Sequence, residues 1–119
     1  MKLIGVLMLL VVHTASACEQ GRASHFILDT IDHNKVVIFS KTTCLYSNLA
    51  KEQFQKLNYP FLAVELDDRH DGKMIQDILG EMTAASTVPR VFVDGKFIGG
   101  GTEIKAMYES GELKKLLKI

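Results

Sequence analysis

Cys44 has the chemical setting in this sequence that is most typical of a reactive residue. It lies in the segment KTTCLYS, residues 41–47, between an expected strand and an expected helix. A thiol at the first turn of a helix faces unpaired backbone N–H groups and the positive end of the helix dipole, which stabilise a thiolate. Lys41 adds a positive charge three residues earlier. Because polar residues rather than an apolar run surround Cys44, the pattern favours a reactive thiol over a structural one.

Three further segments can assemble around this cysteine. Thr87-Val88-Pro89 precedes an expected strand, and Gly99-Gly100-Gly101-Thr102 opens an expected helix. Between them, Asp94-Gly95 is the two-residue signature of a tight hairpin. A helix N-terminus binds carboxylates through its free N–H groups. Together the segments indicate a thiolate beside a cleft for a small thiol peptide, and hence reversible sulfur exchange.

Hydrophobic patterns predict the elements that must position these segments. Helices are expected at 23–32, directly after Gly21, at 44–57, at 74–82 and around 104–117 with an interruption at Gly111; strands are expected at 36–39, 61–66, 90–93 and 96–98. This order places parallel strands first and a hairpin last. We therefore expect an α/β fold with a small mixed four-stranded sheet and helices on both faces.

Residues 1–17 have the pattern of a secretory signal peptide. One lysine precedes an apolar run, residues 3–12, and small residues stand at Ala15 and Ala17. The run is shorter than the about 20 residues that a membrane span needs. We expect cleavage after Ala17, which leaves one domain, residues 18–119, in the lumen of the ER or Golgi or outside the cell. A retained anchor is the alternative, and only then would a membrane be a partner.

Composition excludes several classes of function. Fourteen basic and fourteen acidic residues give a formal charge of zero, so nucleic acid is not an expected partner. Two cysteines, Cys18 and Cys44, are too few for a disulfide scaffold. The four histidines lack the spacing of metal ligands, so no structural metal site is expected. Cys18 is a signal-junction residue without a role in this interpretation.

The sequence resembles the glutaredoxin family. The resemblance rests on residues 36–41 and 44–47, on Thr87-Val88-Pro89 and on Ile98-Gly99-Gly100, and it extends from about residue 21 to the C-terminus. Each motif alone is weak, but four motifs in register are specific. The resemblance implies a thioredoxin-like fold, glutathione as cosubstrate and glutathionylated proteins as substrates.

The resemblance also implies roles on the cysteine side of the cleft. Cys44 would be the nucleophile and Tyr46 would line the glutathione groove. Lys41 and Gln76 would contact the glycine carboxylate of glutathione. Taken singly, Lys41 and Gln76 fit an ordinary solvated surface nearly as well, and Tyr46 fits a packing role.

On the opposite side of the cleft, Thr87, Val88 and Pro89 would bind glutathione. Pro89 would be in the cis form, and Val88 would pair its backbone with the cysteine part of glutathione. Gly101 and Thr102 would offer N–H groups, and Thr102 its hydroxyl, to the γ-glutamyl carboxylate. The alternative role for Thr102 is an N-cap of its helix.

Ser47 stands where dithiol members of the family carry a second cysteine. That implies a monothiol cycle, in which Cys44 takes glutathione from a protein and a second glutathione regenerates the thiol. In an oxidising compartment the same exchange also adds glutathione to proteins. Leu45 replaces the common proline, and Tyr46 argues against the branch that carries Gly-Phe between Cys and Ser.

Two alternatives to this enzyme stay open. In the first, a dimer holds a [2Fe–2S] cluster with two Cys44 thiolates and two glutathiones, whereas the enzyme is expected as a monomer. In the second, the groove binds a protein without turnover.

Overall fold

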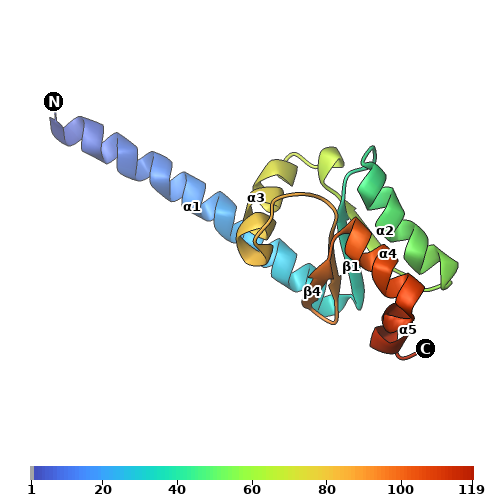
Figure 1. Cartoon of the computed structure of the whole chain (residues 1–119). Coiled ribbons are helices and arrows are strands. Elements are labelled where there is room, and N and C mark those ends of the chain that lie inside the picture. The colour runs from blue at the N-terminus through green and yellow to red at the C-terminus, as the bar shows by residue number, and fades with distance from the viewer. Residues whose placement is uncertain (1) are drawn as a thin grey trace.

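The computed structural model describes the backbone of residues 2–119 and the side chains from residue 17 on (Figure 1). Ten elements lie within this range. They are α1 (Lys2–His33), β1 (Val36–Ser40), α2 (Leu45–Lys56), β2 (Leu62–Glu65), the 3-10 turn η1 (Leu66–Asp68), α3 (Gly72–Thr83), β3 (Arg90–Val93), β4 (Lys96–Gly99), α4 (Gly101–Ser110) and α5 (Glu112–Leu117). The strands form one sheet in the order β2-β1-β3-β4. β1 is parallel to β2 and antiparallel to β3, and β3 is antiparallel to β4. This is the mixed four-stranded sheet of the expected thioredoxin-like fold.

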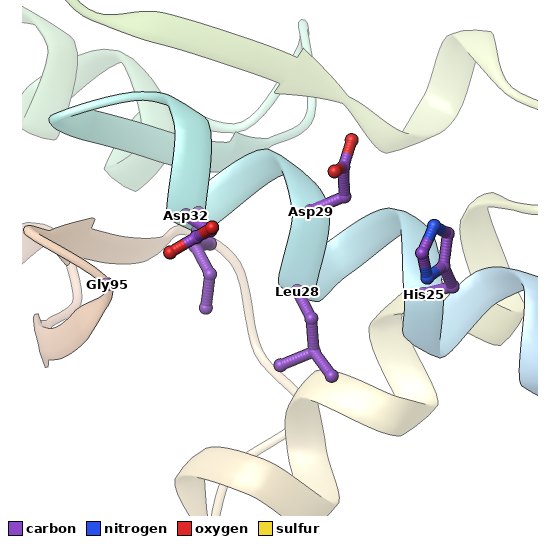
Figure 2. A pocket seen from close by; sticks show the side chains of 6 residues that line it. His25, Leu28, Asp29, Asp32 and Gly95 are labelled. Atoms are coloured by element: carbon purple, nitrogen blue, oxygen red, sulfur yellow. The ribbon is translucent and has the colours of Figure 1, made fainter.

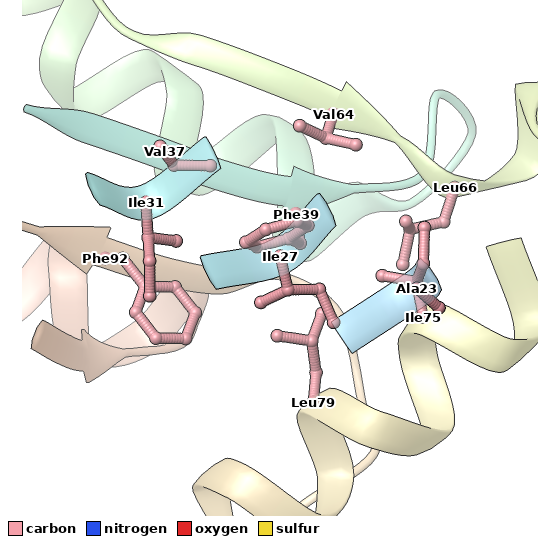
Figure 3. Close-up of a cluster of buried hydrophobic side chains, with 10 residues drawn as sticks. All are labelled: Ala23, Ile27, Ile31, Val37, Phe39, Val64, Leu66, Ile75, Leu79 and Phe92. Carbon is pink, nitrogen blue, oxygen red and sulfur yellow. The ribbon is translucent and has the colours of Figure 1, made fainter. Parts of the chain in front are cut away.

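The two faces of the sheet carry separate cores. All five residues of β1 are buried, and their alternation sends Val37 and Phe39 to one face and Val36 and Ile38 to the other. The first core packs the sheet against α1 and α3 (Figure 3), and the second packs it against α2, α4 and α5. Because β1 is covered on both faces, its C-terminal end is a firm support for the segment that carries Cys44.

Helix α1 begins far earlier than the sequence pattern indicates. The expected start after Gly21 is wrong, because α1 runs without a break from Lys2 and includes Gly21. A glycine in an exposed helix interior costs only about 1 kcal/mol relative to alanine, which is too little to end a helix by itself. The end of α1 at His33 matches the prediction, and the amide of Asn34 donates a hydrogen bond to the carbonyl of Thr30 at 2.9 Å.

The C-terminal part of α1 contributes to the core. Ala23, Ile27 and Ile31, spaced four residues apart, pack onto the sheet, and the segment before them extends away from the domain (Figure 1). In the part of the chain that the structure describes, no helix combines the length and the apolar character needed to cross a membrane.

Candidate active site

Cys44 is the N-cap of α2. Its N–H donates to the carbonyl of Lys41 at 3.1 Å and closes a tight turn, while its own carbonyl accepts from the N–H of Asn48 at 3.1 Å. The latter is the first hydrogen bond of the helix, so the three N–H groups before it have no partner within the helix. The turn follows β1 directly, and thus a buried strand delivers a partly exposed thiol to a helix N-terminus.

The surroundings of Cys44 lower its pKa. Burial raises the pKa of the thiol, but four opposing contributions outweigh it: a hydrogen bond from the Ser47 hydroxyl, the N–H groups of Ser47 and Tyr46, and the charge of Lys41. Ser47 is fully buried, and its oxygen also accepts from the N–H of Lys41 at 3.3 Å. The backbone of Lys41 therefore orients the Ser47 hydroxyl toward the sulfur, a role of Ser47 that sequence reasoning missed.

Asp67 holds the other side of the cysteine turn. Its carboxylate accepts from the N–H of Thr42 at 3.1 and 3.0 Å and from the Thr42 hydroxyl. The bonds from the hydroxyl and N–H of Thr42 hold the pKa of Asp67 below its usual range. Because Asp67 lies in η1, directly after β2, it ties the turn to the neighbouring strand. Its position at the end of a strand adjacent to β1 was the only sequence signal for this contact.

The loop before β3 brings Val88 to the thiol. The Cys44 Sγ lies 3.8 Å from the carbonyl oxygen of Val88, in hydrogen-bonding geometry for sulfur, and the Val88–Pro89 bond is cis, as expected. Helix α3 fixes this loop at Ser86, whose carbonyl accepts from the Gln76 amide at 2.6 Å. Gly80 allows the close approach, since a Cβ there would lie 2.8 Å from the Cβ of Ser86. Gln76 thus braces the loop, and its contact with glutathione stays a prediction.

The buried side chain of Arg90 holds the same loop by hydrogen bonds. Its side chain donates to the carbonyl of Pro89 at 3.0 Å, to the hydroxyl of Thr87 at 3.0 Å and to that of Thr83 at 3.4 Å. Burial lowers the pKa of Arg90, and the charge of Glu103 opposes this effect. Sequence reasoning gave Thr87 to glutathione and did not single out Arg90.

The N-terminus of α4 packs against the first turn of α2. Gly101 is buried there, and a Cβ on it would lie 2.6 Å from the carbonyl oxygen of Tyr46. The first hydrogen bond of α4 joins the N–H of Ile104 to the carbonyl of Gly100 at 3.0 Å, so the N–H groups of residues 101–103 have no partner within the helix. Such groups bind a carboxylate.

The Thr102 hydroxyl does not cap α4, because Gly100 is the N-cap and Thr102 lies two residues inside. It donates instead to the carboxylate of Glu103, which also accepts from the N–H of Gly100 at 3.3 Å. Bonds from the Thr102 hydroxyl and the Gly100 N–H lower the pKa of Glu103.

The predicted residues therefore converge on one surface. The Cys44 thiol contacts the carbonyl of Val88, and the carbonyl of Tyr46 lies against Gly101. The Gln76 amide donates to the carbonyl of Ser86, the residue before Thr87. Tyr46 is 55% exposed, so a ligand can lie against it. A thiol of lowered pKa, an exposed tyrosine and a helix N-terminus with free N–H groups are the features that thiol exchange with a small carboxylate-bearing peptide would use.

A separate hollow beside α1 does not join this site. It is lined by His25, Leu28, Asp29, Ile31, Asp32 and Gly95 (Figure 2). None of these residues contributes to the surroundings of Cys44. Within the described residues, no group of three or more His, Cys, Asp or Glu side chains is placed to hold a metal ion.

Comparisons with known proteins place the chain in a family. The family model for glutaredoxin matches residues 36–98. The chain is 42% identical over 121 residues to Glutaredoxin-C4 of Arabidopsis thaliana, which covers 98% of this chain and 90% of that protein. It is 41% identical over 115 residues to Monothiol glutaredoxin-S6 of Oryza sativa subsp. japonica, covering 96% and 88%.

Mitochondrial glutaredoxin-2 of Mus musculus is 46% identical over 91 residues, covering 76% of this chain, and the chain spans only 58% of that relative's length. Among solved structures, a buckwheat glutaredoxin–glutathione complex superposes with a TM-score of 0.80 at 34% identity, over 84% of this chain and 91% of that one. The sequence motifs, the sheet topology and these similarities agree. The chain belongs to the glutaredoxin family, whose members are glutathione-dependent thiol oxidoreductases.

Proposed function

We propose that this glutaredoxin works by a monothiol mechanism, with Cys44 as the single exchanging thiol. The observation that carries the proposal is the pairing of Cys44 with Ser47. The pKa of Cys44 is lowered, and the side chain one helical turn later is a buried serine that hydrogen-bonds the sulfur. The only other cysteine, Cys18, lies exposed on α1. A mixed disulfide at Cys44 therefore has to be resolved by a thiol from solution.

The cycle has two exchanges. The Cys44 thiolate attacks the glutathione sulfur of a protein mixed disulfide; a bond forms between these two sulfurs, and the protein sulfur leaves as a thiolate that takes up a proton. A glutathione thiolate then attacks the same glutathione sulfur, which gives glutathione disulfide and frees the Cys44 thiolate. Because a sulfur of low pKa is a good leaving group, the features that activate Cys44 also favour its release.

The groove provides the contacts for the glutathione part of the substrate. The N–H groups of Gly101 and Thr102 suit the γ-glutamyl carboxylate, and Lys41 suits the glycine carboxylate. The carbonyl of Val88 accepts from the Cys44 thiol and is released when that thiol ionises, so it becomes available to a peptide backbone. The similarity to a glutaredoxin solved with glutathione supports this assignment.

Turnover of a glutathionylated peptide by the purified protein tests the proposal. We expect release of the peptide thiol to depend on glutathione and to be abolished by Cys44→Ser. Absence of turnover in the wild-type protein would refute the enzyme. Brown colour and dimerisation after anaerobic incubation with iron and sulfide, together with loss of both in Cys44→Ser, would favour the [2Fe–2S] alternative instead.

We further propose that residues 1–17 are a cleaved signal peptide and that the domain acts in the secretory pathway. Among residues 17–119, whose side chains the structure describes, the first core residue is Ala23 and residues 17–20 are exposed, so cleavage after Ala17 removes none of the described core residues. N-terminal sequencing of the protein from its host cell tests this. A mature chain that begins at Cys18 is expected, whereas an intact N-terminus in the membrane fraction would indicate the retained anchor.

A further inference from the structure

Arg90 is the only charged side chain that is buried among those the structure describes, with 8% of its surface exposed. Burying a charge costs several kcal/mol unless polar groups replace the lost water. The guanidinium has three such partners, and they are the carbonyl of Pro89 and the hydroxyls of Thr87 and Thr83. Two of the three partners lie in the cis-proline segment, so the charge is buried where that segment needs support.

The same guanidinium also faces the start of α4, through the Nη2 nitrogen that donates to Thr87. A Cβ on Gly100 would lie 3.3 Å from the Arg90 Nη2, which places the N-cap of α4 directly against the guanidinium. The charge of Glu103 acts on Arg90, and the Glu103 carboxylate in turn accepts from the N–H of Gly100. The ring of Phe97 lies 4.9 Å from the guanidinium carbon and covers another side. Arg90 therefore lies between the cis-proline segment and the α4 N-terminus.

We propose that Arg90 is a positioning residue that fixes the spacing between the two elements that hold glutathione. This inference rests on the proposed function, since it concerns how that substrate is bound. A guanidinium presents five donors in a planar fork and contacts both elements at once, whereas a lysine ammonium is a single point of charge. Arg90 is not among the groups that shift the pKa of Cys44. Its loss should therefore weaken recognition of the glutathione part and leave the thiol unchanged.

Arg90→Lys in the full chain tests the proposal with two substrates. One peptide cysteine is presented as a mixed disulfide with glutathione or with 2-mercaptoethanol, and release of the peptide thiol is followed in a single turnover. We expect the rate for the glutathione disulfide to fall about tenfold, the order of one lost charged hydrogen bond. The rate for the mercaptoethanol disulfide should stay within about twofold, because that substrate lacks the groups the groove binds. The Cys44 pKa, from thiolate absorbance, should not move.

Arg69→Lys is the matched control. The Arg69 guanidinium lies 4.1 Å from the centre of the Phe26 ring and pairs with Asp71 at 2.8 Å, so it joins two parts of the fold by the same contacts outside the site. This variant should lower the melting temperature and keep the wild-type ratio of the two rates. Equal losses of both rates in Arg90→Lys, or an unchanged ratio, would show that Arg90 supports only the fold.

Thr83→Val is the second variant in case Arg90→Lys does not fold, because Thr83 lies in α3 and is not assigned to glutathione. It removes one hydroxyl that accepts from Arg90 and keeps the guanidinium. We expect a several-fold loss for the glutathione disulfide alone, and an unchanged ratio would overturn the inference. The wild-type protein separates the two proposals. Failure of the wild type to release the peptide thiol, or full activity of Cys44→Ser, would refute the proposed function, and the role of Arg90 in it would fall with it.

Discussion

Replacing Gly101 by alanine tests how far the contact between α2 and α4 sets the geometry of the glutathione site. The new Cβ would lie 2.6 Å from the carbonyl oxygen of Tyr46, and an ordinary van der Waals approach begins near 3.4 Å. Since that carbonyl belongs to the first turn of α2, the start of α4 must retreat by about 0.8 Å. A hydrogen bond of about 2.9 Å from α4 to a carboxylate would then exceed the about 3.2 Å limit of a good bond.

Two effects of this substitution have calculable sizes. Losing one charged hydrogen bond costs about 1.5–3 kcal/mol, so kcat/KM for a glutathionylated peptide should fall by about 10- to 100-fold. Overpacking costs a further 1–3 kcal/mol of stability, roughly 4 to 12 °C in Tm for a domain of this size. The backbone N–H of residue 101 is retained in the variant. A loss of activity would therefore come from displacement of the helix and not from removal of a donor.

Gly21→Ala provides the control for the same chemical change. No atom lies within 4 Å of a Cβ at Gly21, which is exposed inside α1, so this variant should gain about 0.5–1 kcal/mol of stability with unchanged turnover. Steady-state kinetics and thermal melts of both variants are the measurements. Wild-type kcat/KM in Gly101→Ala would show that the contact with Tyr46 does not determine the site.

Four more outcomes follow from the contacts of Cys44 and the extent of the core. Ser47→Ala should raise the pKa of Cys44, because it removes the hydroxyl that bonds the sulfur; titration of the thiolate absorbance would show this, and an unmoved titration would contradict it. Because the folded pKa of Cys44 is lowered, alkylation of the thiol should stay fast below the pH at which an ordinary thiol ionises and should slow as pH falls through the folded pKa. Ionisation of the Cys44 thiol also stabilises the folded protein. This contribution is fully present above the ordinary thiol pKa and is lost as pH falls through the folded pKa of Cys44. Thermal melts across this pH range measure it. Deleting residues 1–17 should leave Tm and turnover unchanged, since Ala23 is the first core residue among the side chains that the structure describes; a marked loss of either would assign those residues to the domain.

Local patterns in the sequence were sufficient for most of the fold. The Asp94-Gly95 turn is an example, because both residues have positive φ, of 51° and 77°, as a tight hairpin with this dipeptide requires. The unbroken apolar run of β1 likewise indicated a strand buried on both faces. Cys44 could be found for the same reason, since a strand, a polar turn and a helix are adjacent along the chain.

The supports of the site could not be predicted in this way. Asp67 and Gln76 bond to residues that only the folded chain brings near them. Arg90 bonds to near neighbours in the sequence, but its burial beside Gly100 could not be seen in the sequence. Gly101 was assigned to glutathione by resemblance, but its lack of a side chain is explained by Tyr46, which is remote in sequence. The start of α1 was wrong because a single glycine was given the weight of a helix terminus.

The central place of β1 in the sheet affects how partners reach the thiol. The strand pairs on both edges and is buried on both faces, and the cysteine turn that leaves it is tied to Asp67. Cys44 is therefore held nearly fixed, and in the proposed exchange with a protein mixed disulfide the movement that aligns three sulfurs in a row would fall to the other protein. Modified cysteines on mobile loops or chain ends would make that movement more readily than those within rigid helices or sheets. The proposed function thus predicts that the partner's local flexibility governs partner choice more than its surface chemistry does.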